Sequence, residues 1–259
     1  MHCFAFDIET VPDAALGRRL HGLEGLDDDG VRKAMLARRR QQTGGEFLPL
    51  LQHRVVAISV AFRSRDQFRV WSLGEPDAGE AEIVGRFFDG LDRLSPDLVS
   101  WNGKGFDLPV LHYRAMLHGV QAPRYWETGD GEQGFRWNNY LNRFHWRHLD
   151  LMDVLAGFTS SGRAKLEECA LMLGFPGKLG MHGSRVAECF SRGDIARIRD
   201  YCETDVLNTF LVYLRFEHMR GRLSAAELEA EYELVRSTLR TEDRAHLNAF
   251  LAAWEGPRA

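Results

Sequence analysis

The sequence predicts an α/β fold in which a mixed central sheet is flanked by helices, and three observations support this prediction. Two segments rich in β-branched and aromatic residues, 54–62 and 67–73, are separated by a short polar turn, as in an antiparallel hairpin. Downstream, segments with helical spacing of apolar residues alternate with short apolar runs, a pattern typical of strands connected by helices. At 259 residues the chain is long enough to bury a sizeable core without disulfides.

The elements of the first half follow from local patterns. The segment 79–94 is expected to be a helix because its large apolar residues recur at helical spacing, at Ile83, Val84, Phe87, Phe88 and Leu91. The other elements expected here are, in order, a buried strand at 3–8, a charged and helix-containing insertion at 13–50, the hairpin, and a strand at 98–101.

The second half is expected to be mainly helical. Pro109 in the first turn and Gly119 at the end delimit a helix over 106–119. The further elements expected are an irregular aromatic and basic stretch at 124–147, a strand running into a helix at 148–155, helices at about 164–173 and 194–220, and a C-terminal helical region. We expect residues 1–220 to form one domain and residues 221–259 to form a helical extension packed on it.

Composition argues against several classes of protein. No apolar run approaches ~18 residues, so no membrane-spanning helix is expected, and no basic segment followed by an apolar one marks a signal peptide. The four cysteines form no CxxC pair, which argues against a disulfide framework or zinc knuckle and fits a reducing cytoplasm. The formal net charge of -4 argues against non-specific coating of nucleic acid, but not against an enzyme that handles nucleic acid in one groove.

Two acids, Asp7 and Glu9, stand two positions apart in the first expected strand. Successive side chains of a strand alternate between its faces, so these carboxylates project together while Phe4, Phe6 and Ile8 pack on the other side. Paired carboxylates repel each other, and a divalent cation such as Mg²⁺ or Mn²⁺ removes the conflict. Taken alone, the pair is better explained as two solvated acids at a strand end, because the D-x-E pattern is short and common.

A third acid, Asp107, follows a strand and the glycine-rich turn "NGKGF". An Asp just before a first turn containing proline is a good helix N-cap, which is the simpler explanation of this residue in isolation. The turn lacks the Walker pattern of a phosphate cradle.

The fourth acid lies in "RDYCETDVLNTFLVYLRF". Tyr201 and Asp205 are four residues apart and therefore neighbours on one face of the expected helix, which Val206, Phe210 and Leu214 can anchor to the core. A surface helix with an ordinary Tyr/Asp pair would give the same pattern.

In order and context, "FDIET", "NGKGFD" and "YCETD" resemble the three exonuclease motifs of the DEDD (DnaQ-like) superfamily, in its Tyr-x-x-x-Asp variant. The resemblance covers roughly residues 3–215 and implies a ribonuclease H-like fold. The sequence is most similar to stand-alone bacterial proteins described as predicted 3′–5′ exonucleases related to the proofreading domain of family-B DNA polymerases. Asp200 occupies the position five before Asp205, which excludes the histidine variant of the superfamily.

The resemblance implies a hydrolase with two bound ions, Mg²⁺ or Mn²⁺, that serve the two ends of an in-line displacement at phosphorus. Asp7, Glu9 and Asp205 would hold the ion that activates water, with Asp7 bridging to a second ion supported by Asp107. Tyr201 would orient the attacking water. Its unperturbed pKa of about 10 makes it a positioning group more than a base.

Supporting roles follow for residues beside the acids. Thr10, Asn102 and Phe106 are expected to contact the terminal nucleotide, with bracing of Asp107 as an alternative role for Asn102. The stretch 134–148 interleaves arginines with aromatic rings, as a single-strand groove does, and supplies the candidate substrate-binding residues Arg136, Trp137, Tyr140 and Arg143. An insertion whose rings pack on the core explains this stretch equally well.

Two other features receive simpler explanations. His148, Asp150 and Asp153 could form another metal site, but a strand end followed by a helix cap explains them better. They also resemble a signature of the same group of proteins, which leaves a supporting role beside the metal ligands open. Lys178 lies in a flexible-looking stretch and is expected to be an ordinary loop lysine, with phosphate contact as the less favoured role.

The predicted function is therefore removal of nucleotides from the 3′ end of single-stranded nucleic acid, with DNA favoured. An exoribonuclease acting on short RNA is the first alternative, because the same acids serve both substrates and the sequence does not reveal contacts to the 2′-hydroxyl. A non-catalytic module that binds nucleic acid or protein is the second, and the complete acid set argues against it. The sequence identifies no protein partner.

Overall fold

A five-stranded mixed sheet forms the centre of the computed structural model, which describes residues 1–256. Its strand order is β3-β2-β1-β4-β5, so the first strand of the chain is also the central one. The pairs β1–β2 and β2–β3 are antiparallel, whereas β1–β4 and β4–β5 are parallel. The strands are β1 (His2–Pro12), β2 (His53–Ser64), β3 (Gln67–Ser72), β4 (Asp97–Ser100) and β5 (His148–Asp150). The predicted hairpin and mixed sheet are confirmed.

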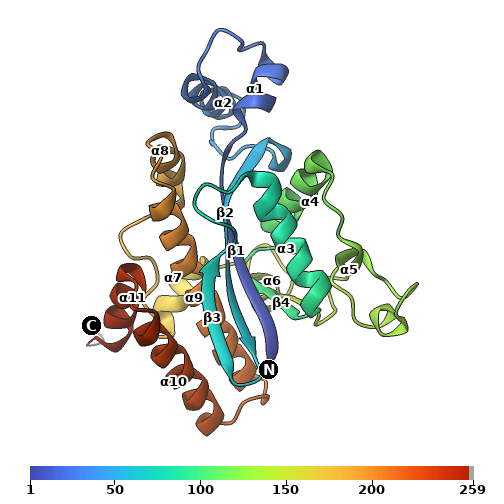
Figure 1. The fold of residues 1–259 in the computed structure, drawn as a ribbon, viewed down its shortest axis with the longest axis vertical. Coiled ribbons are helices and arrows are strands. Elements are labelled where there is room, and N and C mark those ends of the chain that lie inside the picture. Colours follow the sequence, from blue (N-terminus) through green and yellow to red (C-terminus); the bar gives the residue numbers. More distant parts are fainter. Residues whose placement is uncertain (257–259) are drawn as a thin grey trace.

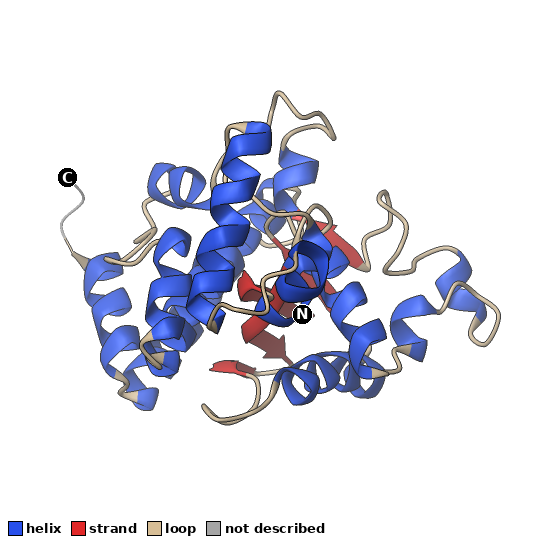
Figure 2. Cartoon of the chain, turned by 90° about the horizontal axis from the view of Figure 1, so that it is seen from above, coloured by secondary structure: helices blue, strands red, loops and turns tan. Residues whose placement is uncertain are grey.

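Helices cover both faces of this sheet, as Figures 1 and 2 show. The helices of the first half are α1 (Ala14–His21), α2 (Asp28–Thr43), α3 (Glu80–Leu94), α4 (Asp107–His118), α5 (Pro123–Trp126) and α6 (Leu151–Leu155). Those of the second half are α7 (Leu166–Met172), α8 (Val186–Ser191), α9 (Ile195–Met219), α10 (Ala225–Glu242) and α11 (Ala245–Glu255). Short 3₁₀ turns occupy Leu50–Gln52, Gln133–Arg136 and Gly183–Arg185. None of the helices in the described part of the chain is long and apolar enough to cross a membrane.

The two faces of the central strand belong to two different cores. Phe4, Phe6 and Ile8 pack into the cluster that includes the buried face of α3 and part of α4. Cys3 and Ala5 pack into the cluster formed by α9 and the C-terminal helices. Because side chains alternate along a strand, Asp7 and Glu9 lie on the side of α9.

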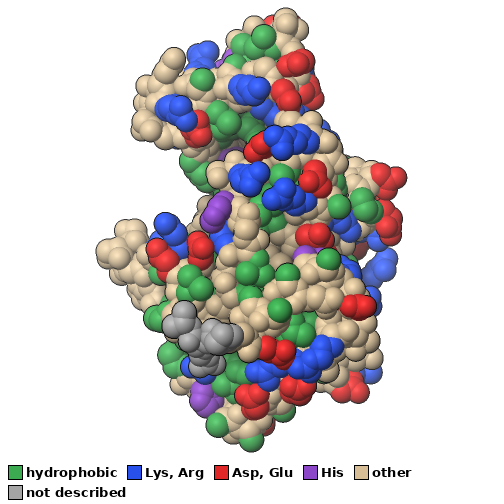
Figure 3. Space-filling view, turned by 90° about the vertical axis from the view of Figure 1, so that its left-hand side faces the viewer, with side chains coloured by type: hydrophobic (Ala, Val, Ile, Leu, Met, Phe, Trp, Pro, Cys, Tyr) green, Lys and Arg blue, Asp and Glu red, His purple; other side chains and the backbone are tan. Residues whose placement is uncertain are grey.

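The insertion at 13–50 folds into α1 and α2, which pack on each other around Val31 and Met35. Gly17 is needed at this contact, because a Cβ there would lie 2.3 Å from the Met35 sulfur. In Figure 1 these two helices project beyond the end of the sheet, and Figure 3 shows a hollow beneath this lobe. On the face in Figure 3, basic and acidic side chains are interspersed, in keeping with the net charge of -4.

The C-terminal helices continue the core of the sheet domain. Helices α10 and α11 contact α9, α10 also contacts β3, and Tyr232, Val235, Leu239, Leu247 and Phe250 are buried in the same cluster as α9. The predicted division at residue 220 stays a prediction, but any extension that begins there shares its apolar core with the preceding residues.

Candidate active site

The central strand presents Asp7 and Glu9 toward α9. Across the antiparallel ladder these residues face Ser59 and Ala57, whose small side chains leave room above the sheet. The register shifts between Glu9 and Thr10, and such a bulge bends the strand and redirects the side chains beside it. Glu9 is 8% exposed, so its carboxylate is held largely out of water.

Asp107 reaches the same strand from the start of α4. Its Oδ1 accepts a hydrogen bond from the Ile8 backbone N–H at 3.2 Å, which fixes the third carboxylate beside the first two. Asp107 is the first residue of α4 and does not cap it, because the residue at the cap position is Phe106 and makes no side-chain cap bond. The capping explanation of Asp107 is therefore wrong.

The turn before Asp107 is shaped by close contacts. A Cβ on Gly103 would lie 2.3 Å from Ser100 Oγ, and one on Gly105 would lie 2.4 Å from Asn102 Oδ1, so the glycines permit a tight turn. Asp150, at the end of β5, accepts bonds from the backbone N–H groups of Asn102 and Lys104, both at 2.9 Å. The expected cap is also present, since Asp150 accepts from the Asp153 backbone N–H.

Helix α9 brings Tyr201 and Asp205 against the sheet. The helix packs on β1 and β2, and Tyr201 and Asp205 are only 5% and 7% exposed. The surface-helix alternative is therefore wrong. Glu203 anchors the same turn, accepting a hydrogen bond from Ser72 Oγ at 2.8 Å and pairing with Arg244 and His246, each at 2.8 Å.

Sequence reasoning missed the position of Lys178. Its Nζ donates to the Tyr201 hydroxyl at 2.7 Å and lies 3.9 Å from Asp205 Oδ2. Asn208 holds the preceding residue, accepting from the Gly177 N–H and donating to the Gly177 carbonyl. The expectation of an ordinary loop lysine is wrong, and the only sequence signal was a lysine in an arginine-rich chain that holds four lysines in all.

The grouped carboxylates destabilise one another's ionised forms. Burial, followed by the charges of Asp107, Glu9 and Asp205, raises the pKa of Asp7 well above its ordinary value. Burial also raises the pKa of Glu9 and that of Asp205, and it raises the pKa of Asp107 to about 7. The positive charge of Lys178 opposes the shift at Asp7, Glu9 and Asp205 without cancelling it. The site therefore has an excess of negative charge for a cation to balance.

The residues present fit a divalent cation. Ligand atoms of Asp7, Glu9 and Cys202 lie within 4.8 Å of one another, and Asp205 Oδ1 is a buried oxygen without a hydrogen-bond partner among the described residues. Burial raises the pKa of the Cys202 thiol, so it stays protonated and donates to the Asp7 backbone carbonyl at 3.4 Å. The available donors are thus carboxylate oxygens, which suit Mg²⁺ or Mn²⁺.

An aromatic cluster, Phe47, His53 and Phe106, lies next to the acids. The ring centroids of the three residues are 5.1 to 5.7 Å apart, and Phe47 is 64% exposed. Thr10 Oγ1 is 2.8 Å from His53 Nδ1, so this cluster is tied to the strand one residue after Glu9. Sequence reasoning singled out Thr10 and Phe106 but missed Phe47 and His53, which come from the insertion and the strand after it.

The basic aromatic stretch is partly structural. Tyr140 is 1% exposed, donates to the Pro96 carbonyl at 2.7 Å and stacks on Tyr125. The expectation that Tyr140 offers its ring to a base at the surface is therefore wrong, because the ring is a core residue. Arg143 forms a bidentate pair with Asp153, with both contacts at 2.6 Å.

Arg136 and Trp137 are exposed, Trp137 to 77%, so both side chains are accessible to a strand. Asn102 adopts a left-handed conformation with φ 65°, and it braces the turn before Asp107 through its backbone N–H.

A mixed sheet that carries two carboxylates on its central strand, with a third at the start of α4 and a fourth on α9, has the arrangement of a ribonuclease H-like exonuclease domain. The chain belongs to a family described as "Predicted 3'-5' exonuclease related to the exonuclease domain of PolB", whose model matches residues 45–254. The matched region contains Asp107, Tyr201 and Asp205 and begins after Asp7 and Glu9. No curated protein matches the chain significantly. The family implies a nuclease that hydrolyses nucleic acid.

Proposed function

We propose that the protein is a two-metal-ion 3′–5′ exonuclease that releases nucleoside monophosphates from single-stranded ends, with DNA as the preferred substrate. The observation that carries this proposal is the convergence of Asp7, Glu9, Asp107 and Asp205 on one site together with Tyr201. A module that only binds has no use for buried carboxylates that raise one another's pKa. The family's relation to the exonuclease domain of PolB supports DNA.

In this proposal, Asp7, Glu9 and Asp205 would hold one Mg²⁺ or Mn²⁺, and Asp7 and Asp107 would hold a second. Bound there, such ions neutralise the carboxylates and the phosphate and lower the pKa of water. The unpartnered Asp205 Oδ1 is a ready ligand atom.

Tyr201 orients the attacking water in this scheme. Burial and the charges of Asp205 and Glu9 raise the pKa of its hydroxyl far above the usual range, so the group stays protonated. A hydroxyl that accepts from Lys178 directs its own proton elsewhere, toward a neighbouring oxygen. Lys178 also brings a positive charge close to Asp205. With a phosphate bound beside Asp205, this charge would stabilise the negative charge that develops on the phosphate during displacement.

Substrate contacts are proposed on two sides of the acids. The Phe47–His53–Phe106 cluster offers ring faces to the terminal base, and Thr10 holds the orientation of His53. Asn102 shapes the turn that carries Asp107. Arg136, Trp137 and Arg143 would contact the strand further from its end.

The test uses 5′-labelled oligonucleotides, single-stranded DNA beside the same sequence in RNA, incubated with Mg²⁺ or Mn²⁺. We expect a ladder that shortens from the 3′ end, that is lost in Asp205→Ala and that persists in Asp89→Ala. Asp89 is the matched control, because it is an exposed aspartate on α3 outside the acid cluster.

The sugar preference is read from the same gel. If RNA is shortened faster than DNA, RNA and not DNA is the preferred substrate. Intact oligonucleotides with both metals, or an Asp205→Ala protein as active as wild type, would contradict the nuclease and favour a binding module.

A further inference from the structure

A pocket opens beside the turn that precedes Asp107. It has a volume of about 420 Å³ and is lined by the start of α4, by α5, by the stretch around Tyr140 and by the end of β5. None of the five proposed catalytic residues lines it. Its size falls in the range of small-molecule sites, roughly 300–1,000 Å³.

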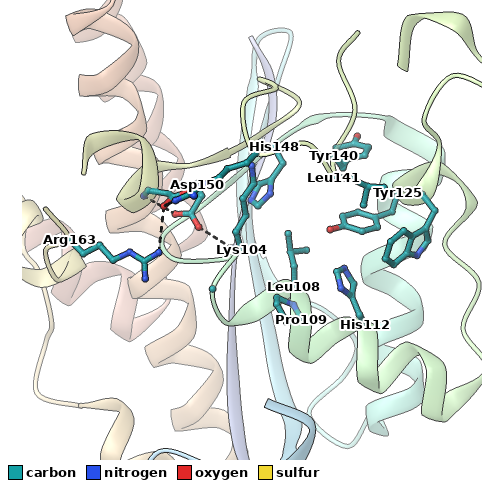
Figure 4. A pocket seen from close by; sticks show the side chains of 14 residues that line it. Lys104, Leu108, Pro109, His112, Tyr125, Tyr140, Leu141, His148, Asp150 and Arg163 are labelled. Carbon is teal, nitrogen blue, oxygen red and sulfur yellow. Dashed lines mark hydrogen bonds and ion pairs between the residues drawn. The ribbon is translucent and has the colours of Figure 1, made fainter. Parts of the chain in front are cut away.

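Two histidines line this pocket, His112 from α4 and His148 from β5, as Figure 4 shows. His112 Nε2 and His148 Nδ1 are both buried and have no hydrogen-bond partner among residues 1–256. The other His148 nitrogen, Nε2, lies 2.8 Å from Ser100 Oγ, so the ring orientation is fixed. His148 is 1% exposed, and a buried polar atom left unpaired costs about 1–3 kcal/mol. Such atoms require a partner that the described side chains do not supply, such as water, an ion or a ligand.

Both rings are suited to hydrogen bonding with the polar edge of an uncharged ring. Burial lowers the pKa of His112 to about 4 and that of His148 well below its ordinary value, so both imidazoles are neutral near neutral pH. A neutral imidazole can donate from one nitrogen and accept at the other. Trp126, which is 52% exposed and packs on His112 with 5.0 Å between ring centroids, adds a ring face at the mouth.

The opposite side of the pocket is charged. Figure 4 shows Lys104, Arg163 and Asp150 on the side away from Tyr125 and Tyr140. With Arg143 and Asp153 included, three cations face two carboxylates here. Asp150 already accepts from three backbone N–H groups, and Asp153 is paired with both arginines. One positive charge is therefore left over at this end.

From this polarity we propose that the pocket binds a nucleotide, with the base beside His112 and His148 and the phosphate beside Lys104 and Arg163. The choice of a nucleotide over other anions with a flat polar ring rests on the proposed function. The ligand has two possible sources, a free mononucleotide released by the enzyme or an upstream residue of the bound strand.

The first experiment measures binding of 2′-deoxyadenosine 5′-monophosphate by calorimetry in EDTA, so that the acid cluster carries no metal. We expect wild type to bind it, inorganic phosphate to bind much more weakly, and His112→Leu to weaken binding at least about tenfold, equivalent to about 1.4 kcal/mol. Tyr113→Leu is the matched control, because Tyr113 precedes Arg114 on the same helix, is 48% exposed and does not line the pocket.

Thermal unfolding separates a binding role from a packing role. Leucine removes an unpaired polar atom, so His112→Leu should unfold at the same temperature as wild type or higher. A variant that loses binding and stability together would be explained by damage to the fold. In that case Lys104→Met, at the charged end, repeats the binding test.

The second experiment places one abasic site at successive positions of a DNA strand and measures affinity, also in EDTA. If the ligand is an upstream nucleotide of the strand, an abasic site at one particular position should weaken binding of the strand to wild type. The same abasic site should not weaken the binding to His112→Leu any further. Nucleotide binding that depends on His112 without any positional effect identifies the free mononucleotide as the ligand.

Absence of both effects overturns the inference. A protein that shortens oligonucleotides and shows neither effect refutes the pocket alone. A protein that binds the mononucleotide through His112 and shortens no strand refutes the exonuclease instead.

Discussion

Lys178 Nζ lies 2.7 Å from the Tyr201 hydroxyl oxygen and 3.9 Å from Asp205 Oδ2, so one lysine connects the two residues of the third motif. Because Asn208 fixes the backbone at Gly177, this contact is held by the same helix that carries both of its partners. The lysine is therefore part of the site, although it lies outside all three motifs.

Replacing Lys178 by Met removes a donor and a positive charge while keeping most of the side-chain volume. We expect kcat on single-stranded DNA to fall by about 10²-fold, the typical cost of one preorganised donor. Lys178→Arg should recover part of this loss. Equal rates for wild type and Lys178→Met in single-turnover assays would remove the lysine from the mechanism.

The metal-free protein should become less stable as the pH rises. Burial raises the pKa of Asp107 to about 7, whereas in the unfolded chain it is about 3.9. The unfolded state therefore releases this proton first, and stability falls between about pH 4 and about pH 7. Asp107→Asn should reduce this slope and raise the melting temperature near pH 8, as measured by thermal unfolding in EDTA. An unchanged slope would contradict the raised pKa.

Divalent metal should reverse that loss. At about 100 times its dissociation constant, a metal that binds only the folded state adds about 2.7 kcal/mol, which corresponds to roughly 5–10 °C in a domain of this size. The increase with Mn²⁺ should be larger near pH 8 than near pH 5, where protons compete for the carboxylates. Asp205→Ala should show a smaller increase. An equal increase in both proteins would place the metal elsewhere.

Phe47 provides a test of substrate contact that is separable from folding. Its side chain is 64% exposed, so Phe47→Ala should change stability by no more than about 0.5 kcal/mol. Loss of one stacked base should weaken single-strand binding by about 1–3 kcal/mol. Leu20→Ala, an exposed apolar residue of the same insertion, is the control. If both variants bind like wild type, the aromatic cluster does not contact the base.

Substitution of Glu203 tests how strongly the contacts between α11 and α9 stabilise the fold around the site. Glu203 is 2% exposed and pairs with Ser72, Arg244 and His246, so Glu203→Ala removes one hydrogen bond and two ion pairs at once, although each partner keeps another contact. We expect a loss of about 2–3 kcal/mol in urea unfolding, reduced from the fully buried case because Arg244 is partly exposed. Glu203→Gln should lose less. A smaller loss in Glu203→Ala than in Glu203→Gln would contradict this anchoring.

The motif-bearing elements could be predicted because their signals are local. Strand alternation placed Asp7 and Glu9 on one face, and helical spacing placed Tyr201 and Asp205 on one turn. Lys178, Phe47 and His53 gave no such signal, because tertiary contacts and not spacing bring them to the acids. Helix α8 has only six residues, too few for a periodic pattern, so the sequence raises no expectation of a helix there. Tyr140 could not be assigned to core or surface from an irregular stretch without periodicity.

The carboxylates come from strand β1, from the start of α4 and from α9, and this separation along the chain has a consequence for biosynthesis. A growing chain that has not yet reached residue 205 holds at most three of the four acids and cannot complete the cluster. Contacts over such sequence distances form late, because the cost of closing long loops precedes the stabilisation they bring. If the protein is a nuclease, its chain therefore acquires the capacity to cut only after residue 205 has been synthesised.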